Sequence, residues 1–238
     1  MSPGPVALPA PTDVGAIVCD LDGVVYRGRE AVPHAVAALR RVTVPVVYAT
    51  NNAARPPETV AEHLRDLGLD VQAEDVITSA QAGAAAIAAR MPEATVLAVG
   101  GEGVEAALLE AGLRPTRDGD AVCEAVMQGY GPEVTMAQLA DAAIAVQQGA
   151  WWVATNTDLT IPLARGIAPG NGTLVRAVAQ AAGKQPDRVC GKPFPDLYLV
   201  AAERVGVPPS AIIGIGDRLD TDIEGANAAG SASVLVLT

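Results

Sequence analysis

The sequence is poor in several residue types, and each shortage excludes a class of protein. Aromatic residues make up only 3% of the 238 residues, so the core must be built mainly from alanine, valine, leucine and isoleucine. That composition suits helices packed tightly on a parallel sheet. No apolar run approaches the length that spans a bilayer, and we expect a cytoplasmic protein with no membrane partner.

Cysteine and positive charge are also scarce. The three cysteines, Cys19, Cys123 and Cys190, are scattered without Cys-x-x-Cys spacing, so we expect reduced core thiols rather than a metal or redox pair. Lysine and arginine number 16 against 27 acidic residues, and the formal net charge of −11 argues against a nucleic-acid partner. An acidic protein that handles anions needs locally concentrated positive charge.

Only two histidines are present, which leaves little material for histidine-based catalysis. His63 falls on the helical stretch 58–67, whose apolar stripe contains Val60 and Leu64, so we expect its side chain on the solvated face. His34 follows Pro33 at a predicted helix start and is expected to be structural.

Two carboxylates directly follow an apolar strand near the N-terminus. The strand is Ala-Ile-Val at 16–18, and the run that follows contains Asp20, Asp22 and the turn-forming Gly23. Residues two apart in an extended chain point to the same side, but a turn at Gly23 lets the second acid swing away. One acid can then stay ionised beside a cation and act as nucleophile while the other transfers protons. The alternative is a strand end whose aspartates only cap a turn.

Two later segments offer groups that suit phosphate. Thr50, Asn51 and Asn52 follow the β-rich run 44–49, and each could instead be only a helix cap. Lys192 lies between a glycine and a proline, ahead of a helical pattern at 196–202. Its ammonium could offset crowded anions, although a solvated lysine is the plainer interpretation.

Acidic residues follow a strand once more near the C-terminus. The apolar run 211–216 ends at Asp217, with Asp220 and Asp222 close behind, and these acids could be only caps for the helix predicted at 223–229. In a parallel α/β sheet, however, the carboxyl ends of all strands lie at one edge, and ligands bind there where the strand order reverses. We therefore expect these distant segments to meet.

The four segments resemble the four motifs of the haloacid dehalogenase-like phosphatases. Within that family the chain is similar to the NagD-like branch, which carries a large α/β cap and includes 4-nitrophenyl, pyridoxal and glycerol-phosphate phosphatases. The runs 216–223, 225–230 and 169–173 are especially typical of this branch. The likeness extends from about residue 15 to residue 238 and is strongest to actinobacterial glycerol 3-phosphate phosphatases.

Carried over residue by residue, the resemblance implies roles for the acids. Asp20 would be the nucleophile that forms an aspartyl-phosphate, and Asp22 the general acid and then the general base. Mg²⁺ would be bound by the carboxylates of Asp20 and Asp217 and the backbone carbonyl of Asp22, with a phosphate oxygen and waters, the oxygen-rich set that this ion prefers. Asp222 would act from behind these ligands.

The resemblance also assigns the remaining polar residues. Thr50, Asn51 and Asn52 would bind the phosphoryl group, and Lys192 would balance charge between nucleophile and phosphate. The cap would exclude bulk water and contact the substrate beyond its phosphate. Residues 156–160 are the candidate surface for that contact, with Asp158 as the candidate side chain, and a plain polar turn is an equal alternative.

Apolar strands alternate with amphipathic helices along the chain, which predicts an α/β fold with a Rossmann-like, doubly wound parallel sheet. The length fits this core plus an inserted α/β cap domain. We expect a disordered, proline-rich leader at 1–13, the catalytic core at 14–75 and 187–238, and the cap at 76–186. Strands of the cap are predicted at 95–99, 121–127 and 151–154. The glycine-rich residues 100–103 should be a helix-start turn, and Trp151 and Trp152 packing residues.

The sequence thus predicts a Mg²⁺-dependent phosphatase of a small phosphorylated metabolite, with glycerol 3-phosphate the leading candidate, acting through an aspartyl-phosphate. Two alternatives stay open: a phosphotransferase or mutase with the same intermediate, and a non-catalytic metabolite-binding protein. The intact acids Asp20, Asp22 and Asp217 argue against the second. A homodimer formed through the cap is implied by the resemblance alone.

Overall fold

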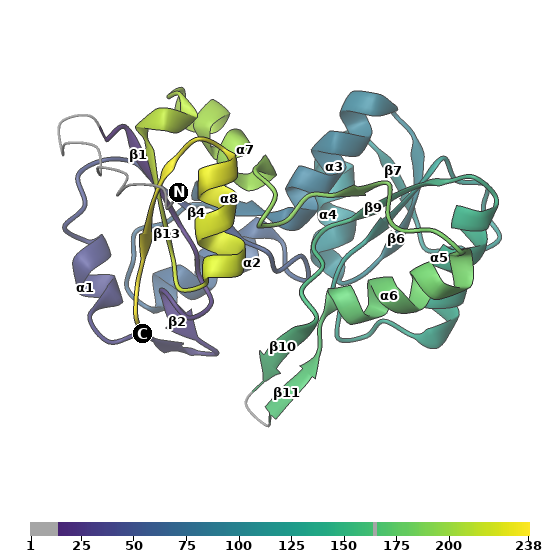
Figure 1. Ribbon diagram of the computed structural model, residues 1–238, viewed down its shortest axis with the longest axis horizontal. Helices are drawn as coiled ribbons and strands as arrows, with labels where there is room; N and C mark the ends of the chain where they lie inside the picture. Colours follow the sequence, from purple (N-terminus) through teal and green to yellow (C-terminus); the bar gives the residue numbers. More distant parts are fainter. Residues whose placement is uncertain (1–13, 164–165) are drawn as a thin grey trace, which may run out of the picture.

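The computed structural model describes residues 14–163 and 166–238, arranged as two α/β halves side by side (Figure 1). The predicted leader at 1–13 lies outside the described residues. Within the part that is described, no helix is both long and apolar enough to cross a membrane.

The first half, which we call the core, is built on a five-stranded parallel sheet. Its strand order is β14 (Ala232–Leu235), β13 (Ile212–Gly216), β1 (Ala16–Cys19), β4 (Val46–Thr50) and β5 (Val76–Thr78). Its central strands are rich in valine, isoleucine and alanine, as expected where a parallel sheet is covered on both faces. The order reverses at β1, because the chain runs outward to β5 on one side and later returns to β13 on the other.

Helices cover both faces of the core sheet. The larger ones are α2 (Pro57–Asp66) on one face and α7 (Asp196–Val205) on the other, accompanied by the short α1 (Ala35–Leu39) and α8 (Glu224–Ala228). Single turns complete this half: η2 (Ala73–Asp75), η3 (Pro209–Ala211) and the π-helical η4 (Leu219–Ile223). A small antiparallel hairpin of β2 (Tyr26–Arg27) and β3 (Glu30–Ala31) follows β1.

The second half, which we call the cap, has its own five-stranded parallel sheet. The order is β12 (Arg188–Val189), β9 (Trp151–Ala154), β8 (Ala125–Gln128), β6 (Thr95–Val99) and β7 (Arg114–Thr116). One face packs on α3 (Ser79–Arg90) and α4 (Glu102–Glu110), and the other on α5 (Met136–Gln147) and α6 (Asn171–Ala182). An antiparallel hairpin of β10 (Thr160–Leu163) and β11 (Gly166–Pro169) projects from this half (Figure 1).

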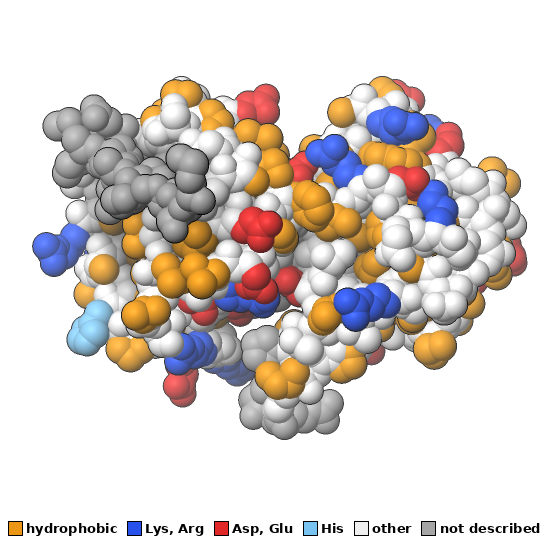
Figure 2. All heavy atoms as spheres, viewed as in Figure 1, with side chains coloured by type: hydrophobic (Ala, Val, Ile, Leu, Met, Phe, Trp, Pro, Cys, Tyr) orange, Lys and Arg blue, Asp and Glu red, His pale blue; other side chains and the backbone are white. Residues whose placement is uncertain are grey.

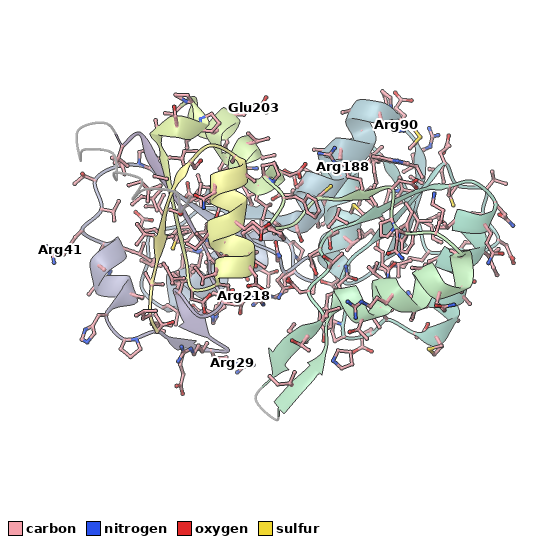
Figure 3. All side chains as sticks on the ribbon, viewed as in Figure 1. Arg29, Arg41, Arg90, Arg188, Glu203 and Arg218 are labelled. Carbon is pink, nitrogen blue, oxygen red and sulfur yellow. The ribbon has the colours of Figure 1, made fainter. Side chains whose placement is uncertain are left out.

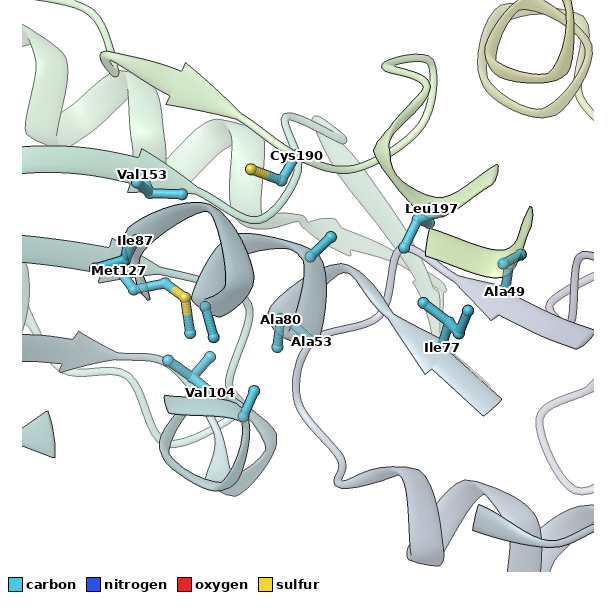
Figure 4. Packing of buried hydrophobic residues seen from close by; sticks show 14 of the residues in the cluster. Ala49, Ala53, Ile77, Ala80, Ile87, Val104, Met127, Val153, Cys190 and Leu197 are labelled. Atoms are coloured by element: carbon cyan, nitrogen blue, oxygen red, sulfur yellow. The ribbon is translucent and has the colours of Figure 1, made fainter. Parts of the chain in front are cut away.

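One apolar cluster joins the two halves. It runs from Ala49, Ile77 and Leu197 in the core, along the alanine-rich α3, to Met127 and Val153 in the cap (Figure 4). The small side chains of α3 let strands and helices of both halves approach it closely. The cap is therefore packed on the core through a continuous hydrophobic interior as well as through its two covalent connections.

The predicted α/β class with a parallel sheet is confirmed, and most predicted elements are found. The strands predicted at 95–99 and 151–154 match β6 and β9, the turn at 100–103 opens α4, and Trp152 is fully buried. The strand predicted at 121–127 begins only at Ala125, because residues 118–121 close a turn through a hydrogen bond from Ala121 to Asp118. The helix predicted at 223–229 is divided between η4 and α8.

Sheet membership places the division between the halves slightly differently from the predicted boundaries. Residues 76–78 were assigned to the cap, but they form β5, which pairs with β4 of the core. Residues 188–189 were assigned to the core, but they form β12, which pairs with β9 of the cap. Strand pairing rather than chain composition decides where each half ends, and the pairing puts the two connections after Thr78 and after Val189.

The burial of the cysteines gives the first testable prediction. Cys19 and Cys190 are buried and Cys123 is half-buried, all three as free thiols, and burial raises the pKa of Cys190 to about 11. Because the thiolate is the reactive form, a thiol reagent at pH 8 should modify at most one cysteine rapidly in the native protein and all three after denaturation. Cys123→Ser should remove the rapid phase, and two or more rapid thiols in the native protein would contradict this core.

Candidate active site

Four segments meet at the carboxyl edge of the core sheet. Asp20 follows β1, Thr50 ends β4, and Asp217 follows β13, while Lys192 enters from the connection that leads back from the cap. These strands lie on both sides of the point where the strand order reverses, the place at which open α/β sheets bind ligands. The structure therefore brings together the segments that the sequence predicted would converge.

The ammonium of Lys192 is the centre of this arrangement. The side chain is only 3% exposed, and Nζ donates hydrogen bonds to Asp20 Oδ1, to Asp222 Oδ1 (2.6 Å) and to the Ala49 carbonyl oxygen (3.2 Å). Asp222 is itself fixed, because its Oδ2 accepts from the Arg218 backbone N–H at 3.1 Å. A buried ammonium held by two carboxylates is a strong, directional constraint, since any unpaired charge there would cost several kcal/mol, roughly.

The surroundings shift the pKa values of this group. Burial raises the pKa of Asp20 to about 7, although Lys192 opposes the shift. Burial also disfavours the ammonium of Lys192, but the facing carboxylates of Asp20 and Asp222 outweigh that effect and raise its pKa. The lysine therefore stays charged, and the carboxylates around it need more positive charge than it provides.

A divalent cation fits the carboxylates. One oxygen each of Asp20, Asp217 and Asp222 lies within 4.8 Å of the others. Three carboxylates face one ammonium, which leaves two negative charges that a divalent cation would balance. Among the described residues, Asp217 Oδ1 is buried without a hydrogen-bond partner, which suits an oxygen that binds a metal ion. The donors are all carboxylate oxygens, the type that Mg²⁺ prefers.

Asp222 is the third acid of this group. One of its oxygens lies within 4.8 Å of oxygens of Asp20 and Asp217, and its expected role behind the metal ligands stays a prediction. Its Oδ1 is also shared with Lys192. The carboxylate of Asp22 lies outside the group, which leaves open the predicted use of its backbone carbonyl as a ligand.

Asp22 lies at the wall of the cavity beside the side chain of Arg55, a residue to which the sequence assigned no role. The surrounding protein raises the pKa of the Asp22 carboxyl by desolvation, and Arg55 opposes this shift. Arg55 lines the same cavity and donates to the Tyr26 hydroxyl at 3.3 Å. The sequence feature that could have indicated a role for Arg55 is its isolation, since it is the only lysine or arginine between Arg41 and Arg65.

The polar residues at the end of β4 make different hydrogen bonds. Thr50, Asn51 and Asn52 all line the cavity. Thr50 and Asn52 make local turn bonds: Thr50 Oγ1 accepts from the Asn52 N–H at 3.0 Å, and Asn52 Oδ1 accepts from the Ala54 N–H at 2.9 Å. The Asn51 side chain instead bonds to Asp158 and to the backbone of Lys192. Asp158, the predicted contact of the cap, lies at the cavity wall.

The cavity lies between the two halves and has a volume of about 1000 Å³. The space-filling view shows the surface hollowed there, with acidic and basic side chains gathered at the junction (Figure 2). Arg218 lies at this junction beside α8, and Arg29 is on the loop between β2 and β3 (Figure 3). Walls from both halves enclose a space suited to a small molecule.

The expectation for His63 holds only in part, because its side chain is half-buried rather than fully solvated. Its ring packs edge-on against Tyr26, with centroids 4.7 Å apart, and Nε2 is buried without a partner among the described residues. The helical periodicity of α2 predicted that Val60 and Leu64 face the core. It could not predict that Tyr26, from the segment after β1, packs against the side of the helix that carries His63. His34 lies exposed at the start of α1.

Fold and site together define a class: a Rossmann-like α/β protein whose capped, carboxylate-rich cavity at the sheet edge is built around a buried lysine. Comparison with known proteins agrees with this class. A family model for haloacid dehalogenase-like hydrolases matches residues 17–114, and a second HAD-hydrolase-like model matches residues 189–238.

Three relatives illustrate the similarity. A D-glycerol 3-phosphate phosphatase of Mycobacterium tuberculosis is 46% identical over 223 residues, 93% of this chain and 62% of the relative. An acid sugar phosphatase of Staphylococcus aureus is 38% identical over 211 residues, 87% of this chain and 80% of the relative. The crystal structure of a glycerol phosphate phosphatase from M. tuberculosis with magnesium aligns with a TM-score of 0.91 at 44% identity, covering 95% of this chain and 69% of that one.

The chain belongs to the haloacid dehalogenase-like hydrolases, which confirms the predicted family. It spans 62% of the length of the M. tuberculosis phosphatase that it matches. The predicted cytoplasmic location and the predicted homodimer through the cap stay predictions.

The close approach of Gly23 to Asp217 makes the cation site testable. Gly23 has φ +92°, and a Cβ there would lie 2.2 Å from Asp217 Oδ2. Gly23→Ala should therefore displace that carboxylate as well as cost about 1–3 kcal/mol of backbone strain. Saturating Mg²⁺ should stabilise the wild type, by about 2.7 kcal/mol at 100 times Kd, and the variant much less, measured as the Mg²⁺-dependent rise in Tm.

A matched control separates strain from displacement. Gly149 has φ +102°, but nothing lies within 4 Å of a Cβ placed there, so Gly149→Ala brings the strain without the clash. It should lower Tm while keeping the full rise with Mg²⁺. An equal rise in the two variants would show that Asp217 does not help to bind the ion.

Proposed function

We propose that this protein is a Mg²⁺-dependent phosphatase that hydrolyses a small phosphorylated metabolite through an aspartyl-phosphate on Asp20. The observation that carries the proposal is the cluster of Asp20, Asp217 and Asp222, whose carboxylate oxygens lie within 4.8 Å of one another at the carboxyl edge of the sheet. Two of these residues, Asp20 and Asp222, also bind the buried ammonium of Lys192. A site of this kind is suited to holding a phosphoryl group beside a nucleophilic carboxylate, because its positive charges make attack by one anion on another feasible.

The proposed reaction proceeds in two displacements. In the first, a carboxylate oxygen of Asp20 bonds to phosphorus as the bond between phosphorus and the substrate's alcohol oxygen breaks, and Asp22 gives its proton to that departing oxygen. In the second, Asp22 takes a proton from water, the resulting hydroxide attacks phosphorus, and the Asp20–phosphorus bond breaks to release inorganic phosphate. The two acids can take different roles because Asp20 is buried beside Lys192, whereas Asp22 opens on the cavity beside Arg55.

Positive charge is provided from two sides. Lys192 offsets part of the negative charge of Asp20 and Asp222 before substrate arrives, and its ammonium can then be shared with phosphoryl oxygens. A Mg²⁺ ion held by Asp20, Asp217 and the backbone carbonyl of Asp22, with Asp222 adjacent, would stabilise the charge that develops on the phosphoryl oxygens. Thr50 and Asn52, which line the same cavity, would hydrogen-bond the same group.

The cavity and the relatives favour a small polar substrate, with glycerol 3-phosphate first. A space of about 1000 Å³ closed by the cap admits a metabolite but no folded macromolecule. Asp158, Asn156 and Tyr130 line the cap side, where they can accept hydrogen bonds from substrate hydroxyl groups. Two of the relatives carry names of glycerol phosphate and sugar phosphate phosphatases.

Removal of the nucleophile tests the proposed activity. With Mg²⁺ present, the wild type should release phosphate from glycerol 3-phosphate and from 4-nitrophenyl phosphate, and a chelator should stop it. Asp20→Asn should lower kcat by more than about 10³-fold, because an amide cannot form the acyl-phosphate. Asp220→Asn is the control, since Asp220 is exposed and, within residues 14–163 and 166–238, pairs only with Arg218. Equal rates in Asp20→Asn and wild type would exclude this mechanism.

The proposed role of Asp22 predicts a dependence on the leaving group. The 4-nitrophenolate ion leaves without protonation, whereas the glycerol alkoxide needs a proton. Asp22→Asn should therefore show a burst of one equivalent of 4-nitrophenolate followed by slow turnover, because only the second displacement is impaired for that substrate. With glycerol 3-phosphate it should show no burst of glycerol, and general acid catalysis worth roughly 10²–10⁴-fold should be lost. Absence of a burst with both substrates would assign the proton transfers to another group.

A further inference from the structure

The side chain of Asn51 has no donor left for a phosphoryl group. An asparagine amide offers two N–H donors and one acceptor oxygen. Nδ2 donates to Asp158 Oδ2 at 3.0 Å and to the Lys192 carbonyl at 2.9 Å, and Oδ1 accepts from the Lys192 N–H at 2.7 Å. Two acceptors and one donor surround the amide, so its orientation is fixed by its partners. The expected role of this side chain as a phosphate ligand therefore conflicts with its hydrogen bonds.

Asn51 lies where both connections between core and cap pass. Its carbonyl oxygen accepts from Ser79 Oγ, at the start of α3, and from Asn156 Nδ2 of the cap, each at 2.7 Å. The second connection passes on its other side, where a Cβ on Gly191 would lie 2.8 Å from Asn51 Oδ1. One residue thus contacts the end of β4, both connections and the cap loop that follows β9.

The backbone of Lys192 is held at two points by this one side chain. Asn51 binds both its N–H and its C=O, while the ammonium at the other end reaches Asp20 and Asp222. The third bond of the amide ties it to Asp158 on the cavity wall. A shift of Asp158 would therefore be passed through a single rigid amide to the residue that balances charge at the nucleophile.

We propose that Asn51 is a positioning residue that couples Asp158 of the cap to Lys192, so that contact between the cap and the substrate and placement of the ammonium depend on one another. This inference rests on the proposed phosphatase function. It assigns Asn51 to the chemical step through Lys192 rather than to direct phosphate binding.

A double-mutant cycle on glycerol 3-phosphate hydrolysis with saturating Mg²⁺ tests the coupling. Asn51→Ala should lower kcat by about 10- to 100-fold with a much smaller change in KM, as for other residues that orient a site residue. Asp158→Ala should also lower kcat. The double variant should be no worse than Asn51→Ala, within about twofold, because the path between the two residues is already broken.

An exchange of polar groups gives a second readout that a merely structural role would not produce. Asn51→Asp places a carboxylate against Asp158 and should be nearly inactive. Adding Asp158→Asn restores a donor and an acceptor between these two positions and should recover part of kcat. Ser79→Ala is the matched control: it removes an equally short and buried bond to the Asn51 backbone, so it should lower Tm while leaving kcat unchanged.

The outcomes are separable. If Asn51→Ala raises KM and weakens inhibition by inorganic phosphate while kcat stays unchanged, Asn51 is a phosphate ligand and the inference is overturned. The inference is also overturned if the losses in kcat from the two single variants multiply in the double variant. It is overturned as well if the exchanged pair, Asn51→Asp with Asp158→Asn, recovers no kcat. The exchanged pair still decides the question if Asn51→Ala fails to fold. A wild-type protein without phosphatase activity would instead refute the proposed function, and this inference with it.

Discussion

The structure depends on the buried ammonium of Lys192. An unpaired charge at that depth costs several kcal/mol, roughly, so the lysine must have its carboxylates, and the carboxylates must have the lysine. Asp20 comes from the end of β1, Asp222 from η4 after β13, and Lys192 from the connection out of the cap. The ion pairs therefore hold together segments up to 172 residues apart in the sequence.

The carboxylates around Lys192 carry more negative charge than its ammonium can balance. Three carboxylates, those of Asp20, Asp217 and Asp222, are close to the single ammonium of Lys192. Burial raises the pKa of Asp20, and the negative charge of Asp222 adds to this shift. A divalent cation and an entering phosphoryl group can both use this imbalance, the cation as counter-charge and the phosphoryl group as a ligand shared by cation and lysine. Electrostatic preorganisation of this kind would let a protein with a net charge of −11 act on the phosphorylated substrate that we propose for it.

The cap is joined to this centre by packing and by polar contacts. Helix α3 carries a hydrophobic interior shared by the two sheets, and its small side chains keep that contact close. Beside this hydrophobic contact, Asn51 makes hydrogen bonds to both connections between the core and the cap, to Ser79 on one and to Lys192 on the other. Because Asn51 binds the backbone of Lys192 as well as Asp158, the proposed substrate contact in the cap and the proposed chemistry in the core are physically linked.

Much of this could be predicted from the sequence, because parallel α/β geometry puts every strand end at one edge. That rule alone brings Asp20, Thr50 and Asp217 together, and the resemblance to the family's motifs adds Lys192. The bonds of Asn51, the packing of His63 on Tyr26 and the membership of β5 and β12 could not be predicted. Each depends on how closely two distant segments approach, and helical or strand periodicity carries no information about that distance.

The central claim is that these distant loops converge on one divalent ion. Anomalous diffraction at the manganese edge, from crystals grown with Mn²⁺ in place of Mg²⁺, tests it most directly. The account predicts one strong peak at bonding distance from carboxylate oxygens of both Asp20 and Asp217, on the cavity side of Lys192. A fully occupied ion elsewhere, with no peak between those two carboxylates, would contradict it.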